Sequence, residues 1–331
     1  MASADSSRTV THKPALALFA GLGSAWVFLL VTLGAFTTSI GAGMAFPDWP
    51  LSNGSINPDG WLSDISKFAE HSHRLTGAIM GLITIGLVVW LWRREARAWL
   101  RHLALWALGI VILQGIIGGK RVLLHSIDVP GFHMSLGEML RIPHGILAQV
   151  YVCILIAVAV ACTRRWIEHG APLGVAVRRT GVVCCALLLV QLVVAATMRH
   201  NAAGLAIYTF PHSTLEGDWL PRDWNFRVSI HFAHRVMAVI LTVALGIFAW
   251  TIRRDRAATL TMRAGASAMI ALLVLQILLG AMAVLSGRNA EITTAHVVVG
   301  ALTLAVVFWL TWVAHRDAIE GPAPLATRTR V

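Results

Sequence analysis

Long runs of apolar residues alternate with short polar segments along the whole chain. A helix needs about 20 apolar residues to cross the hydrocarbon core of a bilayer, which is roughly 30 Å thick. Each run is continuous and lacks the strict alternation of a membrane β-strand. The pattern predicts eight membrane helices, over residues 15–40, 70–92, 102–119, 143–163, 180–199, 229–252, 264–285 and 292–315. We therefore expect an all-α integral membrane protein.

Composition and charge agree with this prediction. The chain of 331 residues is 57% apolar and only 13% charged, whereas soluble domains carry about 25% charged residues. A net charge of +11 would fit a nucleic-acid-binding protein, but 17 of the 27 basic residues fall on one side of the predicted membrane and 8 on the other. The positive-inside rule then places both termini in the cytoplasm. We expect a multi-pass protein of the inner cell membrane, in contact with lipid and not with nucleic acid.

The two halves of the sequence repeat each other. Three motifs of the first half recur 161 or 162 positions later: Ala42-Gly43-Met44-Ala45 as Ala203-Gly204-Leu205-Ala206, His73-Arg74-Leu75 as His234-Arg235-Val236, and Gln114 with Gly118 as Gln276 with Gly280. A nearly constant offset is the signature of a duplication. Each half holds four predicted helices, so both halves have the same orientation. We expect two pseudo-symmetric four-helix bundles, formed by residues 1–165 and 166–331.

Four of the 14 histidines lie early in the even-numbered predicted helices, toward the outer face: His73, His144, His234 and His296. Ionisable residues within membrane helices are costly and usually face the interior of the bundle. Two histidines from facing helices can bind one haem iron axially, so the pattern predicts one haem site per half. Zinc fits less well because two histidines supply too few ligands. The alternative is four scattered histidines that bond to backbone or water.

The residues beside the first and third of these histidines differ between the halves. Glu70 precedes His73 by three residues and shares its helix face, whereas the corresponding residue of the second half is His231. This asymmetry predicts that one half reacts and the other assists. Glu70 is a candidate for handling protons near a substrate; the alternative is an ion pair with Arg74 and a helix cap. His231 lies three residues before His234 and is a candidate either for an alternative ligand or for a supporting group.

Arg74 and Arg235 each follow a predicted iron ligand. A guanidinium group suits a haem propionate, and the alternative is an arginine that reaches toward interfacial water.

Taken together, the motifs resemble those of the COX15/CtaA family of haem A synthases. The resemblance rests on the segments 41–50, 70–74, 144–149, 199–206, 231–235 and 293–296, and it covers nearly the whole chain. It implies an oxidoreductase that converts a ring methyl of haem O to a formyl group, giving haem A for terminal oxidases. Haem O would bind in the first half, with His73 and His144 as ligands and Glu70 near the chemistry. Haem b would be the cofactor of the second half, between His234 and His296.

The same resemblance implies haem O as the substrate. A haem O synthase, a redox partner and a second copy of the chain are candidate partners that the sequence leaves open. One departure stands out. Many members carry cysteines in the first outer loop, where this chain has Ser52 and no cysteine, so a disulfide or thiol role there does not transfer.

Two other functions also remain open. A di-haem b electron carrier between quinol and an outer acceptor would need the same four histidines but not Glu70. A transporter is less favoured, because transporters tend to have broken helices with polar sites at the membrane midplane.

Overall fold

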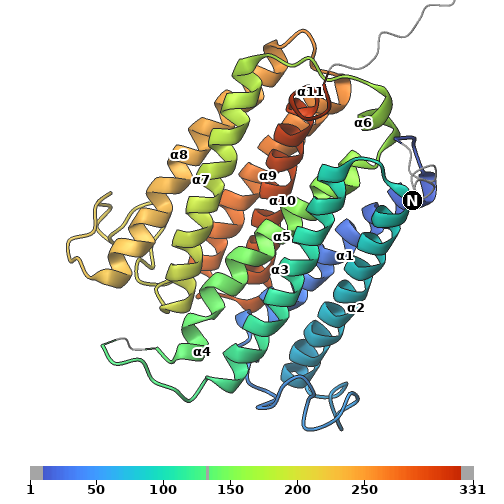
Figure 1. The fold of residues 1–331 in the computed structure, drawn as a ribbon. Helices are drawn as coiled ribbons and strands as arrows, with labels where there is room; N and C mark the ends of the chain where they lie inside the picture. The colour runs from blue at the N-terminus through green and yellow to red at the C-terminus, as the bar shows by residue number, and fades with distance from the viewer. Residues whose placement is uncertain (1–9, 132–133, 322–331) are drawn as a thin grey trace, which may run out of the picture.

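The structure, a computed structural model, describes residues 10–131 and 134–321. Within these ranges it is helical and has no strand. Eight helices are long and apolar enough to cross a membrane, which confirms the predicted number (Figure 1). They are α1 (Pro14–Ser39), α2 (Ile65–Arg94), α3 (Ala98–Leu123), α4 with α5 (Leu136–Met139 and Arg141–Ala161), α7 (Val175–His200), α8 (Phe226–Arg254), α9 (Leu260–Leu285) and α10 (Ala290–Ala314). The described residues also form two short helices outside the membrane spans, α6 (Arg164–Glu168) and α11 (Arg316–Glu320).

Most helices extend beyond the apolar runs that predicted them. α2 begins at Ile65 and not at residue 70, because the carboxylate of Asp64 accepts hydrogen bonds from the N–H groups of the first turn. α8 begins at Phe226, where the side chain of Asn225 acts in the same way. Hydropathy falls at the polar membrane surface, whereas the helix continues until a capping residue ends it. The expectation that Glu70 opens a helix is therefore wrong.

The long helices contact one another in two closed sets. In the first set α1 packs against α2, α2 against α3, α3 against α5, and α5 against α1. In the second set α7, α8, α9 and α10 contact one another in the same cyclic order. The sets meet through α1, α5, α7 and α10, and they lie side by side in Figure 1, blue to green and yellow to red.

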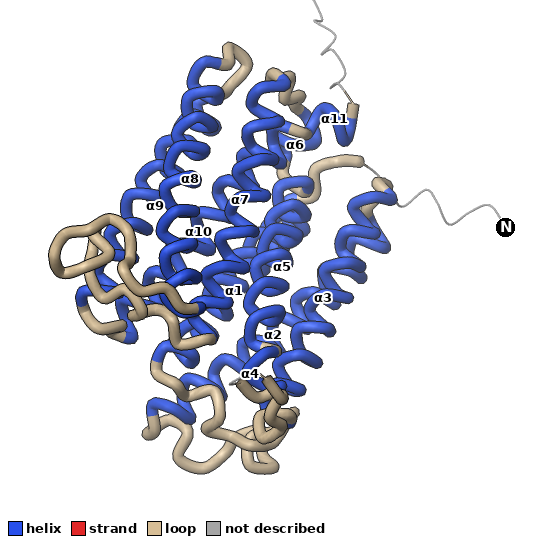
Figure 2. The backbone as a smooth tube through the Cα atoms, turned by 90° about the vertical axis from the view of Figure 1, so that its left-hand side faces the viewer, coloured by secondary structure: helices blue, strands red, loops and turns tan. Residues whose placement is uncertain are grey.

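The two ends of this helix assembly differ in character (Figures 1 and 2). Long connections, residues 40–64, 124–131 and 201–225, lie at one end, which we call the loop end. The opposite end, called the terminal end, holds residues 10–13, the short helices α6 and α11, and short connections.

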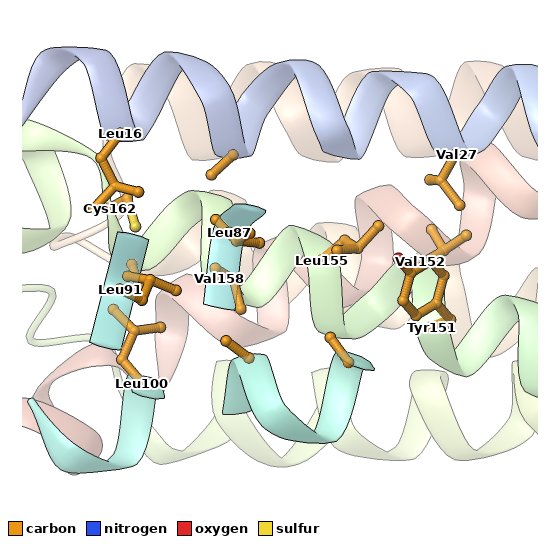
Figure 3. Close-up of a cluster of buried hydrophobic side chains, with 14 of the residues drawn as sticks. Leu16, Val27, Leu87, Leu91, Leu100, Tyr151, Val152, Leu155, Val158 and Cys162 are labelled. Atoms are coloured by element: carbon orange, nitrogen blue, oxygen red, sulfur yellow. The ribbon is translucent and has the colours of Figure 1, made fainter. Parts of the chain in front are cut away.

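Apolar packing fills the terminal-side part of the first set. Leu87, Leu91, Leu155 and Val158 are buried there among residues of α1 and α3, and Figure 3 shows them facing one another. Further toward the loop end, Tyr151 Oη lies 2.5 Å from Thr84 Oγ1. The second set has a separate buried cluster that includes Phe248, Met269 and Leu310. The terminal-side parts of both sets are therefore filled mainly by apolar side chains.

Ion pairs fix the terminal end. Arg97 donates to Glu95 at 2.9 Å and to Glu320 at 2.8 Å. Burial alone would raise the pKa of the Glu95 carboxyl group, but the hydrogen bonds from Arg97 outweigh it and lower that pKa. For Arg97, burial is likewise outweighed by its two carboxylate partners, and its pKa is raised. These contacts tie the connection between α2 and α3 to the C-terminal helix α11.

Candidate functional site

The first histidine pair lies between α2 and α5. The imidazole rings of His73 and His144 have their centres 6.5 Å apart and their planes at 77°. The Nδ1 atom of His73 lies 3.2 Å from the carbonyl oxygen of Leu30 on α1. Since a carbonyl only accepts, this contact assigns the ring proton to Nδ1 and leaves the Nε2 lone pair of His73 for a metal.

Glycines make room for both rings. A Cβ atom placed on Gly34 of α1 would lie 2.8 Å from Cε1 of His73. A Cβ atom on Gly118 of α3 would lie 3.3 Å from Cε1 of His144. On the same helix the amide of Gln114 donates to the backbone carbonyl of His144 at 2.8 Å. The neighbouring helices α1 and α3 therefore fix the positions of the two imidazoles.

The second pair lies between α8 and α10 and has the same ring spacing, but its polar contacts differ from those of the first. The rings of His234 and His296 also have their centres 6.5 Å apart, with planes at 62°. A Cβ atom on Gly280 of α9 would lie 3.0 Å from Cε1 of His296. Gln191 of α7 donates to the carbonyl of His234 at 3.1 Å, and Gln276 Nε2 lies 3.3 Å from His296 Nε2. The structure thus brings together the four predicted histidines as two pairs.

Each pair has the dimensions of an axial ligand pair. An iron bonded to two imidazole nitrogens at about 2 Å each separates the ring centres by roughly 6 Å. In the part of the chain that the structure describes, no three His, Cys, Asp or Glu side chains gather as a candidate metal site. A haem iron needs only two protein ligands because the porphyrin provides four, so the residues present fit haem better than a bare metal ion.

Glu70 is buried, with 4% of its surface exposed, and both of its oxygens have partners. Oε1 forms an ion pair with Arg74 at 2.6 Å, and Oε2 accepts a hydrogen bond from the N–H of Ala45 at 2.7 Å. The ion pair with Arg74 is therefore present. The helix-cap part of that alternative is wrong, since Asp64 caps α2.

His231 takes the place of Glu70 in the second half. It is 3% exposed, and its Nδ1 accepts the N–H of Ile207 at 3.2 Å. Phe46, which lies 161 positions before Ile207, directs its N–H toward Glu70 at 3.4 Å. The backbone N–H at equivalent positions of the two loops is thus bound by a carboxylate in the first half and by an imidazole in the second.

Arg74 and Arg235 bind backbone carbonyl groups at equivalent positions of the two loops. Arg74 donates to three carbonyl oxygens, those of Phe46, Asp48 and Leu51, at 3.1, 2.8 and 2.6 Å. Arg235 donates to those of Ile207, Thr209 and His212, at 3.1, 2.6 and 3.2 Å. Every acceptor of Arg235 is 161 positions after an acceptor of Arg74. Both guanidinium groups are engaged with backbone, and a propionate role for them stays a prediction.

The first loop has a further anchor at Asp48. Its carboxylate accepts the N–H groups of Asn53 and Gly54, each at 2.7 Å. Burial opposes ionisation of Asp48, but these hydrogen bonds outweigh it and lower its pKa. Ser52 is buried, and its Oγ lies 3.0 Å from His71 Nδ1.

Sequence reasoning missed the contributions of α1. Leu30 and Gly34 both contact His73, yet a backbone carbonyl leaves no trace in a sequence. Glycine is also frequent in this chain, with 28 residues. The repeat gives no help either, because the residue 161 positions after Gly34 is Ala195.

Comparison with known proteins gives a consistent result. The model of the family COX15-CtaA, cytochrome oxidase assembly protein, matches residues 17–308. The chain is 26% identical to the haem A synthase of Shouchella clausii over 86% of this chain and 90% of that protein. It is 28% identical to the haem A synthase of Sphingopyxis alaskensis, over 91% and 92% of the two chains. It is 29% identical to that of Symbiobacterium thermophilum, over 78% and 82%.

Proposed function

The chain belongs to the COX15-CtaA family of cytochrome oxidase assembly proteins, and from that premise we propose that it is a haem A synthase, oxidising a ring methyl of haem O to a formyl group. The observation that carries the proposal is the pair of matched histidine sites with a buried carboxylate beside only one of them. An electron carrier would have no use for that difference.

The proposal assigns one site to each half of a duplicated chain. Residues 1–165 and 166–331 form two pseudo-symmetric four-helix bundles, a division supported by the two closed sets of helix contacts. The arginine anchors support it as well, since their loop acceptors keep the offset of 161 positions. Both termini are cytoplasmic, and the loop end with its two histidine pairs lies toward the outer face of the inner cell membrane.

Haem O is the substrate of the first site, where His73 and His144 hold its iron. Leu30 and Gln114 orient these ligands through the contacts described above. The fixed imidazoles hold the porphyrin plane in one orientation relative to the protein. Preorganised positioning of this kind contributes a large part of enzymatic rate enhancement.

Glu70 serves the reaction as the group that handles protons. Written as a half-reaction, R–CH3 + H2O gives R–CHO, four protons and four electrons. The redox partner takes up the electrons, and a nearby base is required for the protons. Each carboxylate oxygen can accept two hydrogen bonds, and Oε1 has one partner, Arg74. Glu70 can therefore accept a proton at Oε1 without releasing the loop from Oε2.

In the second half, His234 and His296 hold haem b as a resident cofactor. A haem b held by these two histidines would supply one-electron redox chemistry. His231 ties the second loop to α8 in place of a carboxylate. The remaining partners in this proposal are a haem O synthase, a redox protein and a second copy of the chain.

Haem extraction from the purified protein tests this function. The protein is expressed in a host that makes haem O, and its bound haems are separated by chromatography. Haem A together with haem b is the expected result. Haem b alone, with haem O abundant in the same membranes, would overturn the synthase proposal and favour an electron carrier.

A further inference from the structure

Arg121, at the loop end of α3, faces the first histidine pair. Gln114, Gly118 and Arg121 are spaced by four and three residues and therefore share one face of the helix. Gln114 and Gly118 on that face both contact His144. Arg121 lies one turn beyond them, and its charge acts on both His73 and His144.

The guanidinium of Arg121 is only partly used by the protein. One nitrogen donates to the carbonyl of Gly43, while Nε is buried and has no hydrogen-bond partner. Glu70 lies near enough to act on Arg121 electrostatically, but its oxygens bond to Arg74 and Ala45. No ion pair to Arg121 occurs among residues 10–131 and 134–321.

Arg199, at the loop end of α7, has the corresponding properties near the second pair. It lies eight residues, or about two turns, after Gln191, which contacts His234. One of its nitrogens donates to Ala35 O at 3.0 Å and to Ser39 Oγ at 2.9 Å, both on α1. Its Nε is buried without a partner, its charge acts on His296, and it has no ion pair within the described residues.

A third arginine, Arg288, lies in the connection between α9 and α10, at the loop end of the second half. The side chain of Arg288 lies over Gly204, where an added Cβ would be 3.5 Å from its Cδ. Arg121 lies in the same way over Gly43, the residue 161 positions before Gly204. Arg288 also acts on Arg199 electrostatically. Both halves therefore place positive charge without a carboxylate partner beside a histidine pair.

Partly buried arginines without an anion are costly in a membrane protein. Arg74 and Arg235 offset that cost through three loop carbonyls each, but Arg121 and Arg199 do not. A planar guanidinium binds carboxylates with strong, directional hydrogen bonds, and a haem carries two carboxylates on one edge of its ring.

We propose that Arg121 in the first half and Arg199 in the second bind the carboxylate groups of the porphyrins, while Arg74 and Arg235 fold the loops. The inference rests on the proposed function, since it requires haem at both histidine pairs. It assigns binding of the porphyrin carboxylates to arginines of α3 and α7. It does not assign this role to Arg74 and Arg235, which directly follow the histidine ligands in the sequence.

The test compares each haem with its dimethyl ester, which has the same iron and ring but no charged carboxylates. His234→Ala isolates the first site, titrated with haem O, and His73→Ala isolates the second, titrated with iron protoporphyrin IX. Absorbance titration of the full-length protein in detergent gives the affinity for acid and ester. Arg121→Gln and Arg199→Gln are placed in these two backgrounds, with Arg222→Gln, an exposed loop arginine paired with Asp218, as control.

In the parent backgrounds, the acid should bind about 10-fold to 100-fold more tightly than the ester, as expected for a hydrogen bond between charged groups. Arg121→Gln and Arg199→Gln should each remove most of this preference at their own site by weakening acid binding alone. Arg222→Gln should leave it unchanged. If a glutamine variant is not monodisperse, the lysine variant replaces it. Lysine keeps the positive charge but lacks the planar guanidinium group, so the preference for acid over ester should be lost only in part.

Two results are decisive against the inference. The first is an arginine variant that binds acid and ester equally more weakly, and the second is one that keeps the full preference for the acid. Either outcome would show that these arginines do not bind carboxylates, although haem still binds. Failure of the parent proteins to bind either form would instead contradict the proposed function.

Discussion

A graded series of alanine substitutions at glycines tests the assignment of the histidine ligands. Non-bonded carbon atoms rest about 3.5–4.0 Å apart. A methyl group on Gly34, 2.8 Å from Cε1 of His73, therefore forces the two groups apart by about 0.7–1.2 Å. At Gly280, where the distance to His296 is 3.0 Å, the required shift is about 0.5–1.0 Å. At Gly118, at 3.3 Å from His144, it is only about 0.2–0.7 Å.

Metal–ligand distances tolerate only about 0.2 Å, so these shifts are large enough to weaken an axial bond. Disturbing the groups that orient metal ligands typically costs about 10-fold to 100-fold in affinity. We expect a loss of this size for Gly34→Ala and Gly280→Ala, at the first and second sites respectively. Gly118→Ala should lie at or below the lower end of that range.

Gly115 of α3 and Gly246 of α8 provide matched controls, because no heavy atom lies within 4 Å of a Cβ placed on either. Alanine there should leave haem binding unchanged and stabilise the helix by about 0.5–1 kcal/mol. Haem affinity is measured by absorbance titration, and folding by thermal unfolding of the same samples. Haem binding by Gly34→Ala and Gly280→Ala as tight as that of the controls would refute the reasoning.

Three further predictions address Glu70, the loop anchors and the terminal end. Glu70→Gln should retain haem at both sites but abolish formation of the aldehyde, measured by haem chromatography; unchanged haem A output would remove Glu70 from the mechanism. Arg235→Gln should lower the unfolding free energy by about 1.5–3 kcal/mol, since it removes charged hydrogen bonds to three loop carbonyls; a Tm equal to that of the parent protein argues against the anchor. Because the pKa of Glu95 is lowered from 4.5 in the folded state, its contribution to stability is present above pH 4.5 and is lost as the pH falls toward the folded-state pKa. The Tm of the parent protein should thus fall more steeply below pH 4.5 than that of Glu95→Gln, and identical pH profiles contradict this role.

The sequence was sufficient for the features that depend on composition and repetition. Apolar length predicted the eight membrane helices, because burial in lipid requires it. The repeat singled out His73 and His234, and the helix pattern added His144 and His296. The pairing of these residues then followed from helix contacts within each half.

Contacts that depend on loop conformation could not be predicted. The propionate prediction for Arg74 and Arg235 rested on their position after a ligand, and no sequence pattern indicated that the folded loops present carbonyl oxygens to both. Arg121 counted only as a basic residue at the outer face, whereas Arg199 also belonged to the segment 199–206 on which the family resemblance rests. The proximity of Arg121 to the first pair depends on α3, which continues past the predicted run 102–119 to Leu123. Arg199 is the last residue of the predicted run 180–199, and its proximity to the second pair depends on how α7 packs in the bundle.

The central claim is a division of labour, with substrate haem bound in the first half and cofactor haem in the second. Haem analysis of His73→Ala and His234→Ala, expressed in a host that makes haem O, tests it most directly. His73→Ala should retain haem b and lose both haem O and haem A, whereas His234→Ala should lose haem b and retain haem O. Loss of haem b from His73→Ala with haem b kept by His234→Ala would contradict the assignment of the two halves.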